Sequence, residues 1–353
     1  MNMVVRPASL SGDREDLIAL LERNLPASAV KTHFKWRHED NPAGPGWSWV
    51  IYDRKSGALG AMTSVFPRPM YVDGKPVLCG QVGEFAVDRC YRSLGPAVML
   101  QRATFQPVDS GALALCYDCP PHDQGMSTFL RLGMRPNCEV TRYVLPLRSD
   151  GVLSRKLGKG AWTKPVIAAA NLLLSMRRVN HHIRGLEICS LNGKFGEEFT
   201  YLDKVVPSSG VIRLSRSAEV LNWRYRMRPE AKIDVLVALR GGELLAFLAF
   251  IVYEEGEELT RALIGDLFGH LLPEVGLVLL DAMIEICRRK NVVCVEGYCS
   301  EISPLKPLFE AAGFRARERA ARVVAYAKSG EPNGSILNSR VAWPVGQAEV
   351  IAW

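Results

Sequence analysis

Residues 87–103 read VDRCYRSLGPAVMLQRA, and this stretch decides the fold. Residues 84–87 predict a strand that runs into a short loop, and an amphipathic helix follows. Gly95 and Ala97 fall in the first turn of that helix, where backbone N–H groups have no partner within the helix. Because the helix dipole favours negative charge and Arg89 or Arg92 adds a cation, the stretch predicts a pyrophosphate site.

An internal repeat surrounds this stretch. Trp36-Arg37 corresponds to Trp223-Arg224, Gly83-Glu84-Phe85 corresponds to Gly265-Asp266-Leu267, and residues 129–134 correspond to residues 309–314. Each copy contains, in the same order, a helix with the Trp-Arg pair, two β-rich segments joined by a glycine turn, another strand, a helix, a strand and a short helix. Strands that alternate with helices predict an α/β arrangement in which helices cover the sheet.

The repeat predicts an α/β fold with a mixed sheet and two tandem domains, at residues 1–148 and 186–328. Residues 149–185 are predicted to be a linker that contains a helix at about 164–180, and residues 329–353 a tail. The linker helix has two interpretations, docking on one domain or lying on a membrane surface. The repeat also predicts strands at 112–116 and 292–296 and, in the second copy, a helix with an apolar face from Val275 to Ile286.

Composition excludes several classes of protein. The 353 residues are 48% hydrophobic and 23% charged, as in ordinary globular proteins, and the net charge is +7 without a block of like charges. Nucleic acid is therefore not an expected partner. Nine cysteines are too sparse for a disulfide scaffold. No apolar run predicts a membrane span or a signal peptide, so we expect a cytoplasmic location.

The segment Arg92-Ser93-Leu94-Gly95-Pro96-Ala97 fits the [QR]xxGx[GA] pyrophosphate-loop signature and resembles that of the GNAT acyltransferase superfamily. The chain is similar to tandem bacterial GNAT proteins of cell-envelope and exopolysaccharide pathways. The resemblance implies two domains, each a mostly antiparallel, splayed sheet flanked by helices. It also implies that acetyl-coenzyme A or another acyl-coenzyme A is the cofactor, with its pyrophosphate on the amides of residues 93–97.

The same resemblance implies the chemistry. Phe85, Ala86 or Val87 would donate a backbone N–H to the thioester carbonyl, and an acidic residue on this strand would deprotonate the attacking amine. Glu84 is the candidate base, and a purely structural salt bridge is the alternative. GNAT proteins usually carry a Tyr that gives a proton to the departing thiolate, and this chain has Leu130 at that place. Tyr117 is therefore the candidate acid that protonates the thiolate. Its alternative role is to pack in the core or to form a wall of the substrate site.

Several other side chains have weaker functional interpretations. Asp118 and His122 follow Tyr117 and are candidates for binding the acceptor, and His33 and His38 are candidates for lining the cleft. Cys116 and Cys119 form a CxxC pair without the further ligands that zinc needs, so no metal is expected.

The second copy lacks the pyrophosphate loop. It has Glu274 at the corresponding helix start, and a carboxylate there repels phosphate. We therefore expect the second copy to cover the first and to complete the acceptor cleft. Asp266 stands in the place of Glu84.

The sequence thus predicts an N-acyltransferase, most simply an acetyltransferase, that acts on a primary amine of a small acceptor such as an amino sugar or an amino-acid derivative. Two alternatives stay open at this point. One is a Fem-like aminoacyl transferase that uses aminoacyl-tRNA, and the other is a GNAT-fold binding protein without catalysis. The sequence does not predict the oligomeric state.

Overall fold

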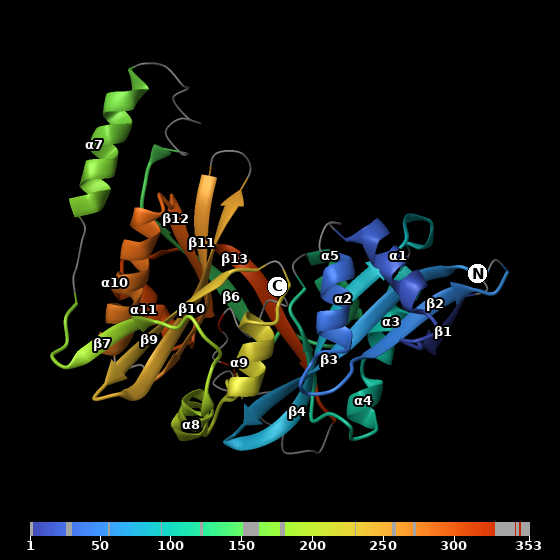
Figure 1. Ribbon diagram of the computed structural model, residues 1–353. Coiled ribbons are helices and arrows are strands. Elements are labelled where there is room, and N and C mark those ends of the chain that lie inside the picture. The colour runs from blue at the N-terminus through green and yellow to red at the C-terminus, as the bar shows by residue number, and fades with distance from the viewer. Residues whose placement is uncertain are drawn as a thin grey trace.

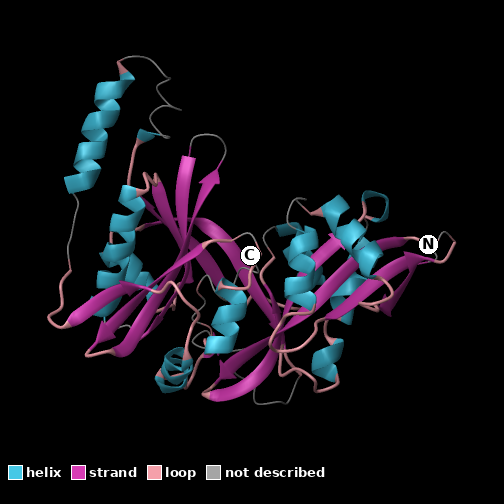
Figure 2. Cartoon of the chain, viewed as in Figure 1, coloured by secondary structure: helices cyan, strands magenta, loops and turns pink. Residues whose placement is uncertain are grey.

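The computed structural model describes residues 3–25, 30–55, 57–92, 94–120, 123–150, 162–176, 181–229, 231–255, 259–270 and 273–328, together with Trp343 and Gly346. Within these residues thirteen strands form one sheet, and helices cover it on both faces (Figures 1 and 2). None of the described helices is long and apolar enough to cross a membrane.

The two halves of the chain share one order of elements, except that α4 occurs only in the first half and β8 only in the second. In the first half these are β1 (Met3–Pro7), α1 (Arg14–Asn24), α2 (Val30–His38), β2 (Trp47–Asp53), β3 (Leu59–Val72), β4 (Lys75–Val87), α3 (Leu94–Ala103), α4 (Gln106–Asp109), β5 (Cys116–Asp118), α5 (Asp123–Arg131) and β6 (Cys138–Pro146). After α7 (Thr163–Met176), the second half contains β7 (Leu186–Ser190), α8 (Glu197–Val205), β8 (Ile212–Leu214), α9 (Ala218–Tyr225), β9 (Ile233–Arg240), β10 (Glu243–Glu255), β11 (Leu259–Gly269), α10 (Pro273–Arg289), β12 (Cys294–Ser300), α11 (Leu305–Ala311) and β13 (Arg315–Tyr326).

The sheet is mixed and mostly antiparallel. Its strand order is β1-β2-β3-β4-β5-β13-β6-β12-β11-β10-β9-β7, and β8 pairs with β3. Among the described strands, only β4 with β5 and β11 with β12 are parallel neighbours. The predicted fold class, a mixed sheet flanked by helices, is confirmed.

The last strand of each half crosses into the other half. β6 lies between β12 and β13, which belong to the second half. β13 pairs with β6 over most of its length, but its end, Val324 to Tyr326, pairs with β5 of the first half. In Figure 1 this red strand runs from the left half of the molecule into the right half. The exchange joins the two halves through backbone hydrogen bonds.

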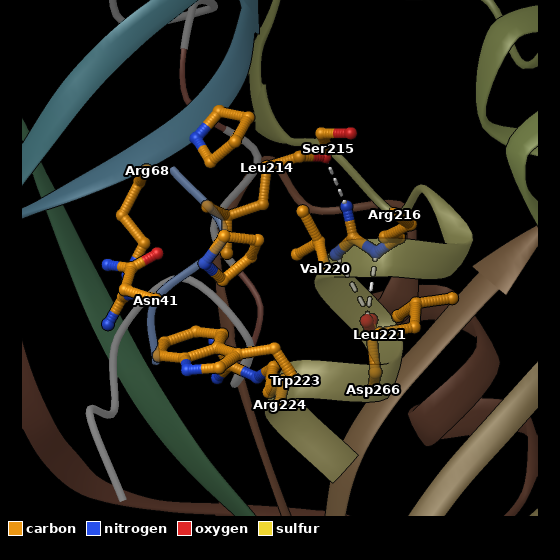
Figure 3. A pocket seen from close by; sticks show the side chains of 12 residues that line it. Asn41, Arg68, Leu214, Ser215, Arg216, Val220, Leu221, Trp223, Arg224 and Asp266 are labelled. Carbon is orange, nitrogen blue, oxygen red and sulfur yellow. Dashed lines mark hydrogen bonds and ion pairs between the residues drawn. The ribbon is translucent and has the colours of Figure 1, made fainter. Parts of the chain in front are cut away.

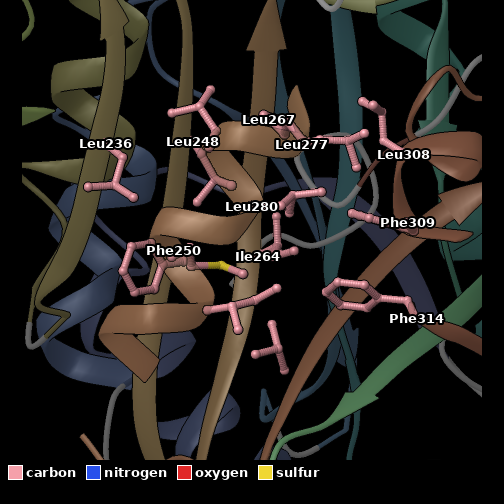
Figure 4. Close-up of a cluster of buried hydrophobic side chains, with 14 of the residues drawn as sticks. Leu236, Leu248, Phe250, Ile264, Leu267, Leu277, Leu280, Leu308, Phe309 and Phe314 are labelled. Carbon is pink, nitrogen blue, oxygen red and sulfur yellow. The ribbon is translucent and has the colours of Figure 1, made fainter. Parts of the chain in front are cut away.

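Helices in both halves form where apolar residues recur at helical spacing. Leu17, Leu20 and Leu21 of α1 are buried against Met62 and Ala86 in the sheet. In the second half, the predicted apolar face of α10 packs with α11 on β9 to β12, in a cluster that contains Phe250, Phe309 and Phe314 (Figure 4). These faces hold the helices on the sheet because burial of apolar area drives the packing.

Three predicted element bounds differ from the structure. The strand predicted at 112–116 is found at Cys116–Asp118, because the ladder with β13 begins only where Cys116 pairs with Tyr326. The strand predicted at 292–296 is Cys294–Ser300, because its pairing with β6 continues to Ser300. The linker helix is Thr163–Met176, and residues 177–180 of the predicted helix lie outside the described residues. The tail from 329 onward is described only at Trp343 and Gly346.

The two Trp-Arg pairs of the repeat meet where the halves touch. The Trp36 and Trp223 rings stack with centroids 4.8 Å apart and planes 18° from parallel. Trp36 Nε1 donates to the carbonyl oxygen of Trp223, and Trp223 Nε1 donates to the carbonyl oxygen of Trp36, each at 2.9 Å. Both side chains are buried. Equivalent residues of the repeat therefore make reciprocal contacts, as in a two-fold symmetric interface.

We expect Trp223→Phe to lower the free energy of unfolding by about 1–3 kcal/mol, because the buried carbonyl of Trp36 loses its donor while most of the stack remains. Trp223→Ala also removes the ring, and we expect a loss of about 3–5 kcal/mol. Urea denaturation measures both. Trp162→Ala is the control, because Trp162 is 60% exposed; a loss for Trp223→Ala no larger than for this control contradicts the prediction.

Candidate functional site

The two parallel strands at the centre of the first half separate after a short contact. β4 and β5 pair only at Gly80 with Cys116 and at Gln81 with Tyr117. β4 then continues to Val87 without β5 beside it. Backbone groups on this edge of β4 are thus available to an extended ligand, which can bind to them as an added strand does.

β4 contains a bulge at Glu84. Ala86 pairs with Met62 and Gly83 pairs with Ser64, so Glu84 and Phe85 lie opposite a single residue of β3. Glu84 has a φ of 52°, which is the left-handed region that non-glycine residues seldom adopt. Such strain is concentrated at functional sites. The bulge also bends β4 where it leaves β5.

The Glu84 carboxylate is buried, and two side chains from α2 contact it. His38 Nε2 lies 2.7 Å from Oε2, and Arg37 Nη1 lies 3.3 Å from Oε1. Burial alone disfavours the carboxylate, but the charges and hydrogen bonds of His38 and Arg37 outweigh burial and hold the pKa of Glu84 below its usual value. Glu84 is therefore ionised at neutral pH, and both of its oxygens are engaged.

Alternation along the regular end of β4 turns one predicted oxyanion residue, Val87, toward the free edge. Asp88 donates its backbone N–H to Gly60 of β3 at 2.8 Å. In an antiparallel ladder successive residues face opposite edges, so Ala86 faces β3 like Asp88, whereas Val87 faces away from β3. Phe85 belongs to the bulge, where this alternation is interrupted. Of the three predicted residues, Val87 thus has the backbone direction that a ligand in the gap requires.

Arg92 lies across this free edge. Its Nε donates to the carbonyl oxygen of Val87 at 3.1 Å, and its Nη2 donates to Asn24 Oδ1 at 3.3 Å. The side chain is otherwise exposed. The guanidinium predicted to meet a pyrophosphate is thus next to the start of α3 and has one face toward solvent.

The predicted pyrophosphate loop ends in the first turn of α3, as the sequence analysis expected. Ser93 and its conformation lie outside the described residues; Leu94 is the first residue of the helix, followed by Gly95, Pro96 and Ala97. Gly95 is exposed, and a Cβ at this position meets no atom within 4 Å. The helix start is open toward solvent at Gly95, which is what close approach of a phosphate requires.

Two positions bear on the proton donor for the thiolate, Leu130 and Tyr117. Leu130 of α5, at the place of the usual Tyr, is 47% exposed. Tyr117 points into an apolar cluster with its ring 5.3 Å from that of Trp343, edge to face, and its hydroxyl is buried. Tyr117 thus fills the role of packing that was its alternative interpretation, and its role as an acid stays a prediction.

Asp118 stands where β5 leaves β4, one residue past the last pair. The backbone N–H of Cys119 donates to its Oδ1 at 2.7 Å. Burial raises the pKa of Asp118 to about 7. The sequence alone predicts only acceptor binding for Asp118, because neither its partial burial nor the separation of the strands is visible in the residue pattern. A carboxyl group that titrates near neutral pH is suited to proton transfer.

The second half repeats part of this arrangement. Asp266 lies directly after a register shift between β10 and β11, whereas Glu84 lies within the bulge of β4, and an Asp266 oxygen lies 3.5 Å from Tyr225 Oη. Tyr225 occupies the position of His38 in the repeat. Asp266 is bound by Arg216 through two hydrogen bonds of 2.9 and 3.1 Å. Glu274 is exposed in the first turn of α10, where the sequence analysis placed it.

A small pocket lies between the halves and is lined by Asn41, Pro42, Arg68, Pro69, Leu214, Ser215, Arg216, Val220, Leu221, Trp223, Arg224 and Asp266. Figure 3 shows Arg68 and Asn41 on one side and α9 with Arg216 on the other. The cavity has a volume of about 10 Å³, close to the minimum for one water molecule. Among the residues that the structure describes, no cluster of three or more His, Cys, Asp or Glu could hold a metal.

Solved structures resemble this chain although no family model and no curated protein matches it. A GCN5-related N-acetyltransferase from Anabaena variabilis has a TM-score of 0.63 at 14% identity over 92% of this chain and 72% of the other. A probable N-acyltransferase from Enterococcus faecalis has a TM-score of 0.64 at 12% identity over 93% and 73%. N-myristoyltransferase of Saccharomyces cerevisiae with bound myristoyl-CoA has a TM-score of 0.60 at 13% identity over 92% and 82%.

These likenesses identify the fold. The chain has the fold of GNAT acyltransferases, and the resemblance inferred from residues 92–97 is confirmed at that level. The splayed strands, the bulge and the open start of α3 are features of this chain's own structure.

Stability should depend on pH through Asp118. The ordinary pKa of an Asp is 3.8, and that of Asp118 in the folded chain is about 7. Between these two pH values the folded chain keeps the proton on Asp118 and the unfolded chain releases it, so wild-type stability falls as pH rises through this window. Asp118→Asn removes this loss. We expect the variant to equal wild type at pH 4 and to exceed it by about 1–3 kcal/mol at pH 8. Urea denaturation at both pH values measures this, and a constant difference between the two proteins refutes it.

Proposed function

We propose that the protein is an N-acyltransferase that moves an acyl group from an acyl-coenzyme A to a primary amine. One observation carries the proposal: the free edge of β4 leads, within a few residues, to the open N-terminus of α3. An extended thioester cofactor needs both features in this order, a strand edge for its amide groups and a helix start for its phosphates. The fold shared with acyltransferases supports it.

The residues near the gap suggest how the cofactor is held. Val87 offers its carbonyl to a pantetheine amide, and Arg92, which now occupies that carbonyl, would turn to the pyrophosphate at residues 93–97. The backbone N–H of Phe85 or Val87 would then donate to the thioester oxygen as charge develops. Met99 of α3 and Leu130 of α5 are 40% and 47% exposed on helices that pack together, and both offer apolar contact to the cofactor.

Two carboxyl groups are candidates for removing the proton of the amine. Glu84 lies on the bulge and would act through water, but its lowered pKa makes it a weak base. Asp118 lies at the mouth of the gap, and its pKa of about 7 suits a base that works at neutral pH. Either group could also return a proton to the thiolate. The acceptor, an amino sugar or amino-acid derivative, rests on the family resemblance, and acetyl is the simplest acyl group.

Gly95→Glu should weaken coenzyme A binding about 100-fold or more, because the new carboxylate competes for the amides of α3 and repels phosphate. Titration calorimetry with coenzyme A measures this. Gly193→Glu is the matched control, since this position is also exposed and open around an added Cβ. Equal affinity in the two variants would exclude the site at α3.

The pH profile of acetyl transfer to a panel of amines separates the two candidate bases. If Asp118 is the base, kcat/KM rises through about pH 7, and Asp118→Asn loses this rise together with about 100- to 10,000-fold of the rate. If Glu84 is the base, the rate shows no such rise near pH 7, and Glu84→Gln gives the larger loss.

A further inference from the structure

The helix α7 lies between the two halves in the sequence and is apolar nearly all round. Its sequence, TKPVIAAANLLLSM, contains only four polar residues, Thr163, Lys164, Asn171 and Ser175. A helix of this kind is normally buried, in a protein core or in a membrane. α7 instead stands at the outer margin of the second half, away from the first half and from α3 (Figure 1).

The exposed side chains of α7 follow helical spacing. Trp162 directly precedes the helix and is 60% exposed, Val166 is 42% exposed and Leu172 is 62% exposed. Ala169 lies between the last two and is also exposed. Steps of four, three and three residues separate these positions, so they lie along one side of the helix. We call Trp162, Val166, Ala169 and Leu172 the apolar face of α7.

The other side of α7 is fixed to the protein through Asn171. Its Oδ1 accepts hydrogen bonds from the backbone N–H and the hydroxyl of Ser149, at 2.7 and 2.8 Å, and its Nδ2 donates to Asp150 at 3.0 Å. Ile167 and Leu174, one turn before and after Asn171, are only partly exposed. The apolar face is therefore turned outward from the chain segment that holds the helix.

The charge in the sequence around α7 has a single sign. Between Asp150 and Glu187 the chain contains seven Lys or Arg residues and no Asp or Glu, whereas the whole chain has 44 basic and 37 acidic residues. Two of the seven, Lys164 in the first turn of α7 and Arg184 before β7, lie among the described residues, and both are exposed. A symmetric contact with a second copy would bring like charges together. Anionic lipids instead offer negative charge above an apolar interior.

We propose that α7 lies on the surface of a membrane that contains anionic lipids, with its apolar face among the acyl chains. Tryptophan is enriched at the level of the headgroups, which suits Trp162 at one end of this face. At about 1.5 Å per residue, the 14 residues of α7 extend over about 21 Å, whereas a membrane crossing needs about 20 residues. The helix is therefore suited to lie in the plane of the membrane.

Flotation of the full chain with lipid vesicles tests the proposal. We expect wild type to bind vesicles of equal parts phosphatidylglycerol and phosphatidylcholine about 10-fold or more tightly than phosphatidylcholine alone, and high salt should reduce this difference. Val166→Gln combined with Leu172→Gln should weaken binding to the anionic vesicles about 10-fold or more, because two apolar side chains no longer enter the acyl region. Glutamine keeps the helix propensity high.

The matched control for this double variant is Tyr201→Gln combined with Val205→Gln. These two side chains belong to α8 and are 62% and 38% exposed, so the control removes similar exposed apolar groups from another helix. We expect the control to bind the anionic vesicles like wild type.

Vesicles with brominated acyl chains give a second measurement, because bromine quenches tryptophan fluorescence on contact. We expect these vesicles to quench wild type, and Trp162→Phe to bind them but to lose most of this quenching. The proposal is wrong if wild type prefers neither kind of vesicle, if the double α7 variant binds as tightly as wild type, or if Trp162→Phe is quenched as strongly as wild type. A dimer that wild type forms without binding vesicles, and that the double α7 variant does not form, would assign the face to a second copy instead; light scattering detects it.

Discussion

The exchange of the last strands between the halves is the constraint on which the rest of the structure depends. Because β13 pairs with β5 at Val324 to Tyr326, one edge of β5 is held by the second half, and its other edge meets β4 at only two residue pairs. β6 in turn lies between β12 and β13. These backbone ladders hold the halves together and fix β5 at a place where β4 can bend away from it.

The repeat keeps its geometry but changes its chemistry. In both copies a carboxylate lies at a register irregularity of the matching strand. The residue that follows the Trp-Arg pair contacts this carboxylate: His38 contacts Glu84, and Tyr225 contacts Asp266. The first copy follows this strand with an exposed glycine at a helix start, and the second with an exposed Glu274. Electrostatics at the helix start, and not the sheet, therefore separates the two copies in their proposed roles.

The contact between the copies combines stability with an unsatisfied charge. The stacked tryptophans contribute buried apolar area and two reciprocal hydrogen bonds. Arg68 beside this stack reduces the gain, since its Nη1 is buried with no hydrogen-bond partner among the described residues.

The sequence by itself determined the order of elements, the repeat and the start of α3, because these depend on local periodicity, turn residues and the matching of Trp36-Arg37 with Trp223-Arg224. It placed Glu84 on the right strand and Gly95 in the first turn of its helix. Only the tertiary structure decided that Glu84 is tied to His38 and Arg37, that Asp118 is half-buried where β5 leaves β4, and that Nη1 of Arg68 has no hydrogen-bond partner among the described residues. These properties arise from contacts between residues far apart in the chain, and burial and charge balance depend on such contacts rather than on spacing.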